Sequence, residues 1–146
     1  MEERYCSKLV TDLMLTRKNE ENGETEILLS LRKNTGYRDG QYELPGGHVD
    51  AGEDLMQSMV REAKEELLID IQEENLKIVH ILHHYNGDRV NFILTTDRYE
   101  GVPTIGETDK CERLEWFGIN NLPINIIPKI KKSIEEISQG IFYSKL

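Results

Sequence analysis

Short apolar segments bounded by polar turns recur along the chain, and this pattern predicts β-strands. Each segment is rich in β-branched and apolar residues and ends at a polar or glycine-containing turn. Strands are therefore expected at residues 7–16, 26–33, 76–85, 89–99 and 113–119. The polar turn at 19–25 joins the first two strands as a hairpin.

Two other segments carry apolar residues at helical spacing. The first begins after Asp54, which forms a capping box with Gln57 and so satisfies free N–H groups at the start of a helix. Its apolar residues fall on one arc and are Leu55, Met56, Met59, Val60, Ala63 and Leu67. The second helix is expected from Pro128 to Gln139, before Gly140, and its apolar stripe consists of Ile130, Ile134 and Ile137.

The order of these elements is β-β-loop-α-β-β-β-α, and it predicts one α/β domain over residues 1–146. A mixed β-sheet between helices accounts for this order, whereas a run of simple βαβ units does not. The chain has 146 residues, of which 38% are hydrophobic, and this is enough for one domain with a substantial core.

The first predicted helix carries a group of glutamates beside its apolar arc. Glu62, Glu65 and Glu66 share one side of the helix, with Glu66 nearest to the apolar edge. Like charges at this spacing cost roughly 0.2–0.5 kcal/mol a pair, and most such clusters are solvated helix faces. Here, however, a glycine-rich loop at 34–53 precedes the helix. Clustered carboxylates suit a hard cation such as Mg²⁺ or Mn²⁺, which completes its coordination with phosphate and water.

The net charge and the cysteines restrict the partners and the compartment. The formal charge of −9 disfavours a protein that binds duplex nucleic acid, because such proteins need a basic face. A phosphate-containing substrate remains compatible, since divalent cations can supply positive charge. Cys6 and Cys111 form no CxxC pair and suit a reducing compartment. With no long apolar segment and no apolar N-terminal signal, we expect a soluble cytoplasmic protein without a membrane partner.

Residues 47–69 resemble the signature of the Nudix hydrolases, Gx5Ex7REUxEExGU, in which U is a bulky apolar residue. The segment LPGGH stands immediately upstream, and Ala63 is a small residue at the first U position. The positions that match in register are Gly47, Glu53, Arg61, Glu62, Glu65, Glu66 and Ile69. The likeness extends over roughly residues 8–138 and implies an α/β/α sandwich, in which the signature forms a loop, a helix and a loop that bind metal and pyrophosphate.

The resemblance also implies a role for each signature glutamate. Glu62, Glu65 and Glu66 would hold one to three Mg²⁺ ions, with Mn²⁺ as a substitute, helped by the backbone carbonyl of Gly46. Either Glu62 or Glu66 would orient or deprotonate the attacking water.

Other residues of the expected site lie around these glutamates. Arg61 and Glu53 would hold the metal ligands in place. Some family members take a base or a further ligand from a distant loop, and here Glu107 and Glu112 are the candidates, with Glu112 preferred.

Substrate contacts are expected from the loop that leads into the signature. Gly47 and His48 stand next to the expected phosphate position, and Arg38 lies earlier in the same loop. One position departs from the family pattern, because Leu68 stands where the signature has glycine. Either the helix continues past this residue or Leu68 adopts a left-handed conformation, which costs a leucine on the order of 1 kcal/mol.

Three functions are consistent with these features. The preferred one is a Mg²⁺-dependent pyrophosphohydrolase that cleaves a (deoxy)nucleoside triphosphate, or an oxidised form of one, to a monophosphate and pyrophosphate. The second is hydrolysis of ADP-ribose, a nucleotide sugar or a capped RNA 5′ end. The third is a module that senses a nucleotide without hydrolysing it, although the retained glutamates argue against that. A homodimer is expected only from the resemblance.

Overall fold

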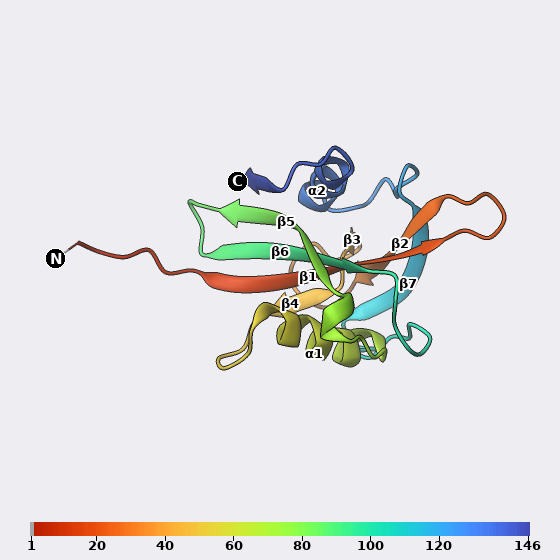
Figure 1. The fold of residues 1–146 in the computed structure, drawn as a ribbon, viewed down its shortest axis with the longest axis horizontal. Coiled ribbons are helices and arrows are strands. Elements are labelled where there is room, and N and C mark those ends of the chain that lie inside the picture. The colour runs from red at the N-terminus through yellow and green to blue at the C-terminus, as the bar shows by residue number, and fades with distance from the viewer. Residues whose placement is uncertain (1) are drawn as a thin grey trace.

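An eight-stranded mixed sheet with a helix on each side organises the computed structural model, which describes residues 2–146 (Figure 1). Its strands are β1 (Lys8–Lys18), β2 (Thr25–Arg32), β3 (Tyr42–Glu43), β4 (Gly46–His48), β5 (Lys77–His84), β6 (Arg89–Thr96), β7 (Cys111–Gly118) and β8 (Tyr143–Lys145). The helices are α1 (Leu55–Leu67) and α2 (Pro128–Ser138), with a 3₁₀ turn at Glu73–Asn75. The predicted sandwich is confirmed.

In this part of the chain, every helix is too short or too polar to cross a membrane.

The long strand β1 lies at the centre of the sheet. It pairs in parallel with β6 along most of its length, and antiparallel with β4 near its start and with β2 near its end. The strand order is β3-β2-β1-β6-β5-β8, with β4 added to β1 and β7 added to β2. Strands β5 and β8 are also parallel, and the remaining pairs are antiparallel, so the sheet is mixed as predicted.

Three short strands lie where the sequence predicts loops or gives no strand signal. Strands β3, β4 and β8 contain only two or three residues each, which is too few to show an alternation of apolar and polar positions. They exist because a longer neighbour offers free backbone groups for pairing. In β4, a Cβ atom on Gly46 would lie 2.0 Å from the carbonyl oxygen of Thr11, so only glycine allows β4 to approach β1 this closely.

The two faces of the sheet form separate hydrophobic cores. Side chains alternate along β1, so that Leu13 and Leu15 face α1 while Met14 faces α2. The α1 core contains the buried arc of that helix, Met59, Ala63 and Leu67. The α2 core contains Ile130 and Ile134 of that helix. Both predicted apolar stripes are therefore confirmed.

The ends of α1 follow the sequence closely. Asp54 is the N-cap, and its side chain and that of Gln57 complete the predicted capping box. At the other end, Leu68 adopts the left-handed conformation with φ of 56° and ψ of 35°. The helix therefore does not continue past Leu68, and the chain leaves α1 through a conformation that is unfavourable for leucine.

Replacing Leu68 by glycine should stabilise the protein. The Leu68 side chain is about half exposed, so its loss removes little packing, while glycine adopts φ of 56° without steric cost. We expect the free energy of unfolding in urea to rise by about 0.5–1 kcal/mol for Leu68→Gly. Leu68→Ala is the control, because it shortens the same side chain and keeps the strain. An equal effect of both substitutions would contradict this interpretation.

Candidate active site

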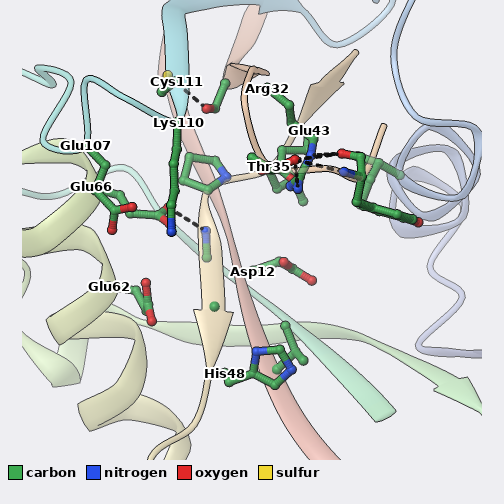
Figure 2. A pocket seen from close by; sticks show the side chains of 18 of the residues that line it. Asp12, Arg32, Thr35, Glu43, His48, Glu62, Glu66, Glu107, Lys110 and Cys111 are labelled. Carbon is green, nitrogen blue, oxygen red and sulfur yellow. Dashed lines mark hydrogen bonds and ion pairs between the residues drawn. The ribbon is translucent and has the colours of Figure 1, made fainter. Parts of the chain in front are cut away.

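A cavity of about 820 Å³ lies beside β4, between the glutamate side of α1 and the start of α2 (Figure 2). Its wall includes residues from β1, β4, β6, α1, the loop after β2 and the segment before β7. The predicted site residues Gly46, Gly47, His48 and the three glutamates of α1 all line it. This volume is typical of pockets for a small ligand such as a nucleotide.

The guanidinium of Arg61 connects the loop before α1 to the glutamates of the helix. It donates to Glu53 at 2.7 and 3.1 Å, to Glu62 at 2.9 Å and to Glu65 at 3.2 Å. It also donates to the backbone carbonyl of His48 on β4 at 3.0 Å. The hydrogen bond from Arg61, and a second one from the N–H of Asp50, hold the pKa of Glu53 at about 2. Arg61 and Glu53 thus connect the loop before α1 to the expected metal ligands, and their positioning role stays a prediction.

Glu62 is the most buried of the α1 glutamates and lies directly over Gly47. It is 8% exposed, whereas Glu66 is only partly buried. A Cβ atom on Gly47 would come within 2.4 Å of Glu62 Oε1, so a larger residue here would displace this carboxylate. Burial raises the pKa of Glu62, and the ion pair with Arg61 opposes this shift.

Glu66 faces the cavity from the same side of α1. Its Oε2 accepts a hydrogen bond of 2.9 Å from the backbone N–H of Gly46, and the role of the Gly46 carbonyl as a metal ligand stays a prediction. Burial raises the pKa of Glu66 to about 8, and the negative charge of Glu62 shifts it in the same direction. The carboxylates of α1 therefore form a site with excess negative charge.

The loop at 100–112 brings a fourth glutamate, Glu107, to the same end of the cavity. The loop is fixed to the end of α1, because the N–H groups of Thr104 and Gly106 donate to carbonyls of that helix at 2.9 Å. A Cβ atom on Gly106 would lie 1.8 Å from the carbonyl oxygen of Glu65, so only glycine permits this contact. Figure 2 shows Glu107 beside Glu66, and its charge helps to raise the pKa of Glu66.

Two predicted site residues do not reach the cavity. Glu112 is exposed on β7 and does not line the wall, whereas Glu107 does. Arg38 also lies outside the wall, with its guanidinium 6.0 Å from the ring centre of Tyr37 and its φ at 48°. His48 lines the wall with an exposed side chain at the end of β4.

The far side of the cavity contains polar residues that the sequence analysis did not identify. Asp12 on β1 accepts a 2.8 Å hydrogen bond from Asn91 on β6, and Asn91 in turn contacts His84 on β5 at 3.1 Å. Burial raises the pKa of Asp12 to about 7, against the effect of the hydrogen bond from Asn91. In the sequence, Asp12, Asn91 and His84 are marked only by being polar residues at strand positions whose side chains point into the protein.

The carboxylates near α1 are not yet arranged around a cation. Among residues 2–146, no three His, Cys, Asp or Glu side chains are gathered closely enough to hold a metal ion. The hydrogen bonds explain this, because Arg61 holds Glu62 and Glu65, while the N–H of Gly46 holds Glu66. All of these groups are nevertheless oxygen donors with excess negative charge, which fits a hard divalent cation. Such binding requires the carboxylates to move closer together, and Glu62 Oε2 and Glu65 Oε1, which Arg61 does not contact, are available for it.

Comparison with known sequences gives a consistent result. A family model described as NUDIX domain matches residues 11–137. The ADP-ribose pyrophosphatase of Methanocaldococcus jannaschii is 32% identical over 102 residues, which cover 68% of this chain and 59% of that protein. The oxidized purine nucleoside triphosphate hydrolase of Danio rerio is 29% identical over 124 residues, which cover 83% of this chain and 72% of that protein.

Comparison with solved structures agrees with the sequence match. The crystal structure of a MutT NUDIX hydrolase from Burkholderia pseudomallei superposes with a TM-score of 0.75 and 27% identity, over 90% of this chain and 98% of that chain. A MutT/nudix family protein from Enterococcus faecalis, also 27% identical, gives a TM-score of 0.67 over 81% of this chain and 46% of that one.

The raised pKa of Glu66 predicts a pH-dependent loss of stability in the metal-free protein. Because the folded-state pKa of about 8 lies above the ordinary value of 4.5, the folded protein retains a proton that the unfolded chain releases between these pH values. The free energy of unfolding should therefore fall as the pH rises from 5 to 8.5. Glu66→Gln, which has no proton to release, should reduce this fall by roughly 1–3 kcal/mol.

Urea denaturation in EDTA at pH 5.5 and 8.5 measures this difference. Glu74→Gln is the control, because Glu74 is exposed in the 3₁₀ turn after α1. The same pH dependence in the wild type and in Glu66→Gln would show that Glu66 is not the responsible group.

Proposed function

The chain belongs to the NUDIX domain family, whose hydrolases act on phosphoric anhydride bonds, and from this premise we propose that it is a Mg²⁺-dependent pyrophosphohydrolase. Its proposed substrate is a (deoxy)nucleoside triphosphate or an oxidised form of one, cleaved to the monophosphate and pyrophosphate. The observation that supports this proposal best is the meeting of Glu62, Glu66 and Glu107 at one end of a cavity of about 820 Å³.

We assign Glu62, Glu65 and Glu66 as the residues that would hold the cation. The hydrogen bonds from Arg61 and from the N–H of Gly46 place these carboxylates at the cavity wall before any ligand arrives. A divalent cation bound there would neutralise charge on the phosphates and make a bound water more acidic. Mn²⁺ has similar ligand preferences and should substitute for Mg²⁺.

We assign Glu107 as the group that takes the proton from the attacking water. Its carboxylate faces the glutamates of α1, and within the described range no hydrogen bond or ion pair engages its side chain. Glu62 and Glu66, the other two candidates, are held by Arg61 and by Gly46, as suits ligands. A carboxylate that is free to accept a proton meets the requirement for a general base better.

Positive and neutral donors next to these carboxylates would bind the phosphates. Lys110 lines the cavity and extends toward the end where Glu66 and Glu107 lie (Figure 2). Gly47 and His48 also line the cavity, and we retain both as phosphate contacts. Arg38 lies outside the cavity wall. It can therefore contact the substrate only where the substrate extends beyond the wall.

Hydrolysis of ADP-ribose is the second candidate function. It is favoured by the 32% identity to a protein named ADP-ribose pyrophosphatase, although the match spans only 59% of that protein's length. Both candidate reactions cleave a phosphoric anhydride bond and release a nucleoside monophosphate. The second product distinguishes them, because it is pyrophosphate in one case and ribose phosphate in the other.

Turnover of a substrate panel tests the proposed activity. With Mg²⁺, the protein should release pyrophosphate and a monophosphate from at least one nucleoside triphosphate, with (d)GTP, 8-oxo-dGTP, ATP, ADP-ribose and a nucleotide sugar compared at equal concentration. EDTA should abolish turnover, and Mn²⁺ should restore it. Release of ribose phosphate from ADP-ribose at the highest rate would favour the second candidate. Tight binding of a nucleotide without any product in Mg²⁺ or Mn²⁺ would contradict both.

Glu107 and Glu112 form a matched pair for testing the base. Glu107→Gln should lower kcat by at least about 100-fold, because general base catalysis contributes about 10²–10⁴-fold. Glu112→Gln should stay within about twofold of the wild type, since Glu112 is exposed on β7 outside the cavity. A large loss of kcat in Glu112→Gln but not in Glu107→Gln would make Glu112 the general base. Wild-type activity in both variants would leave Glu62 or Glu66 as the base.

A further inference from the structure

Strand β7 forms an open border of the sheet. Its only strand partner among residues 2–146 is β2, and β2 has β1 and β3 along its other side (Figure 1). With eight residues, β7 offers a longer edge than β8, which ends the other side of the sheet with three residues. An open edge carries unpaired backbone groups and pairs readily with another chain. The proposed hydrolysis makes no use of this edge.

The backbone groups of Leu114 and Trp116 point away from β2. The N–H of Ile119 donates to the carbonyl of Thr25 at 2.9 Å, which shows that this residue pair exchanges hydrogen bonds between the strands. In an antiparallel pair, residues that bond to the partner strand alternate with residues that face outward, so Leu114 and Trp116 are outward residues. In the part of the chain that the structure describes, the N–H and C=O groups of both have no hydrogen-bond partner.

The charged side chains of β7 make this edge complementary to itself. Arg113 and Glu115 flank Leu114 and lie on the same face of the strand, because side chains alternate. Arg113 is exposed and Glu115 is partly exposed, and within the described range neither forms an ion pair. If two β7 strands lie antiparallel with their Leu114 residues opposite each other, Arg113 of each copy lies opposite Glu115 of the other.

Other registers of two β7 strands lose this match. A pairing centred on Arg113 or on Glu115 places like charges directly opposite each other, which is unfavourable. A pairing centred on Trp116 places both charged residues opposite apolar ones. It also needs the carbonyl of Gly118, which already accepts a hydrogen bond of 2.8 Å within the chain. The register centred on Leu114 is therefore favoured by both the side chains and the backbone.

We propose that two copies of this chain associate through β7, antiparallel about a two-fold axis at Leu114, so that their sheets become continuous. A two-fold contact repeats itself, so each dimer contains two contacts between Arg113 and Glu115. The Leu114 side chains meet on the other face of the strand, where Leu114 and Trp116 pack against the α1 core. The inference goes beyond the proposed hydrolysis and does not depend on it, since neither Arg113 nor Glu115 lines the cavity.

Sedimentation equilibrium over roughly 5–500 µM measures this association. The wild type should dimerise with a Kd on the order of 10–100 µM, because the edge is short and each copy carries a net charge of −9. Arg113→Glu and Glu115→Arg should each raise Kd at least about tenfold, since each places like charges opposite each other twice. Glu115→Arg makes the chain less negative, so general repulsion between copies would act in the opposite direction. Lys77→Glu, at an exposed lysine on β5, is the control with the same charge change as Arg113→Glu.

A mixture of the two variants tests the register itself. With Arg113→Glu in one copy and Glu115→Arg in the other, every contact again joins opposite charges, so a heterodimer should form with a Kd close to that of the wild type. The double variant, which carries both substitutions, should recover the wild-type Kd in the same way.

Four results would overturn the inference. They are a wild type that stays monomeric up to about 500 µM, an unchanged Kd in both single variants, an equal loss in Lys77→Glu, and no recovery in either the mixture or the double variant. None of them bears on the proposed hydrolysis, which the substrate panel tests separately.

Discussion

The ion pairs of Arg61 are the interaction on which the site depends. One guanidinium holds Glu53 from the loop before α1, Glu62 and Glu65 from the helix, and the backbone of His48 on β4. It therefore fixes the loop, the helix and a strand to one another and offsets part of the repulsion among the glutamates. The cluster can exist without a cation for this reason. A cation that enters the site can share Glu62 and Glu65 with Arg61, because Arg61 contacts only one oxygen of each carboxylate.

Close approaches of the chain are the second constraint, and they involve three glycines, of which Gly46 and Gly106 meet backbone atoms and Gly47 meets the Glu62 side chain. Gly46 lies against the carbonyl of β1, Gly47 lies under the carboxylate of Glu62, and Gly106 lies against the end of α1. A Cβ atom at any of these positions would fall under 3.0 Å from a neighbouring atom. The cavity is consequently formed by segments whose backbones approach closely. The loop at 100–112 reaches the glutamates because Gly106 allows it to pack against the end of α1.

What could be predicted from the sequence is what depends on local spacing. Helix α1, its capping box and the shared side of its glutamates follow from the 3.6-residue period, and the structure shows them. The sequence favoured Glu112 over Glu107, whereas only Glu107 lines the cavity, because the choice depends on where a loop meets the distant end of α1. Asp12 gave only the signal of a polar residue at an inward strand position, since its partner Asn91 comes close only through the parallel pairing of β1 with β6. Contacts between segments far apart in sequence account for each of these omissions.

The cavity as a whole divides into an acidic end for a cation with phosphates and a polar end for the rest of the ligand. The central claim is that the acidic end is the place where a divalent cation and the phosphates meet. Anomalous diffraction from crystals grown with Mn²⁺ and a non-hydrolysable nucleoside triphosphate tests it most directly. The account predicts Mn²⁺ bound by Glu62, Glu65 and Glu66, next to the phosphates. Mn²⁺ bound away from α1, or a nucleotide whose phosphates point toward Asp12, would contradict it.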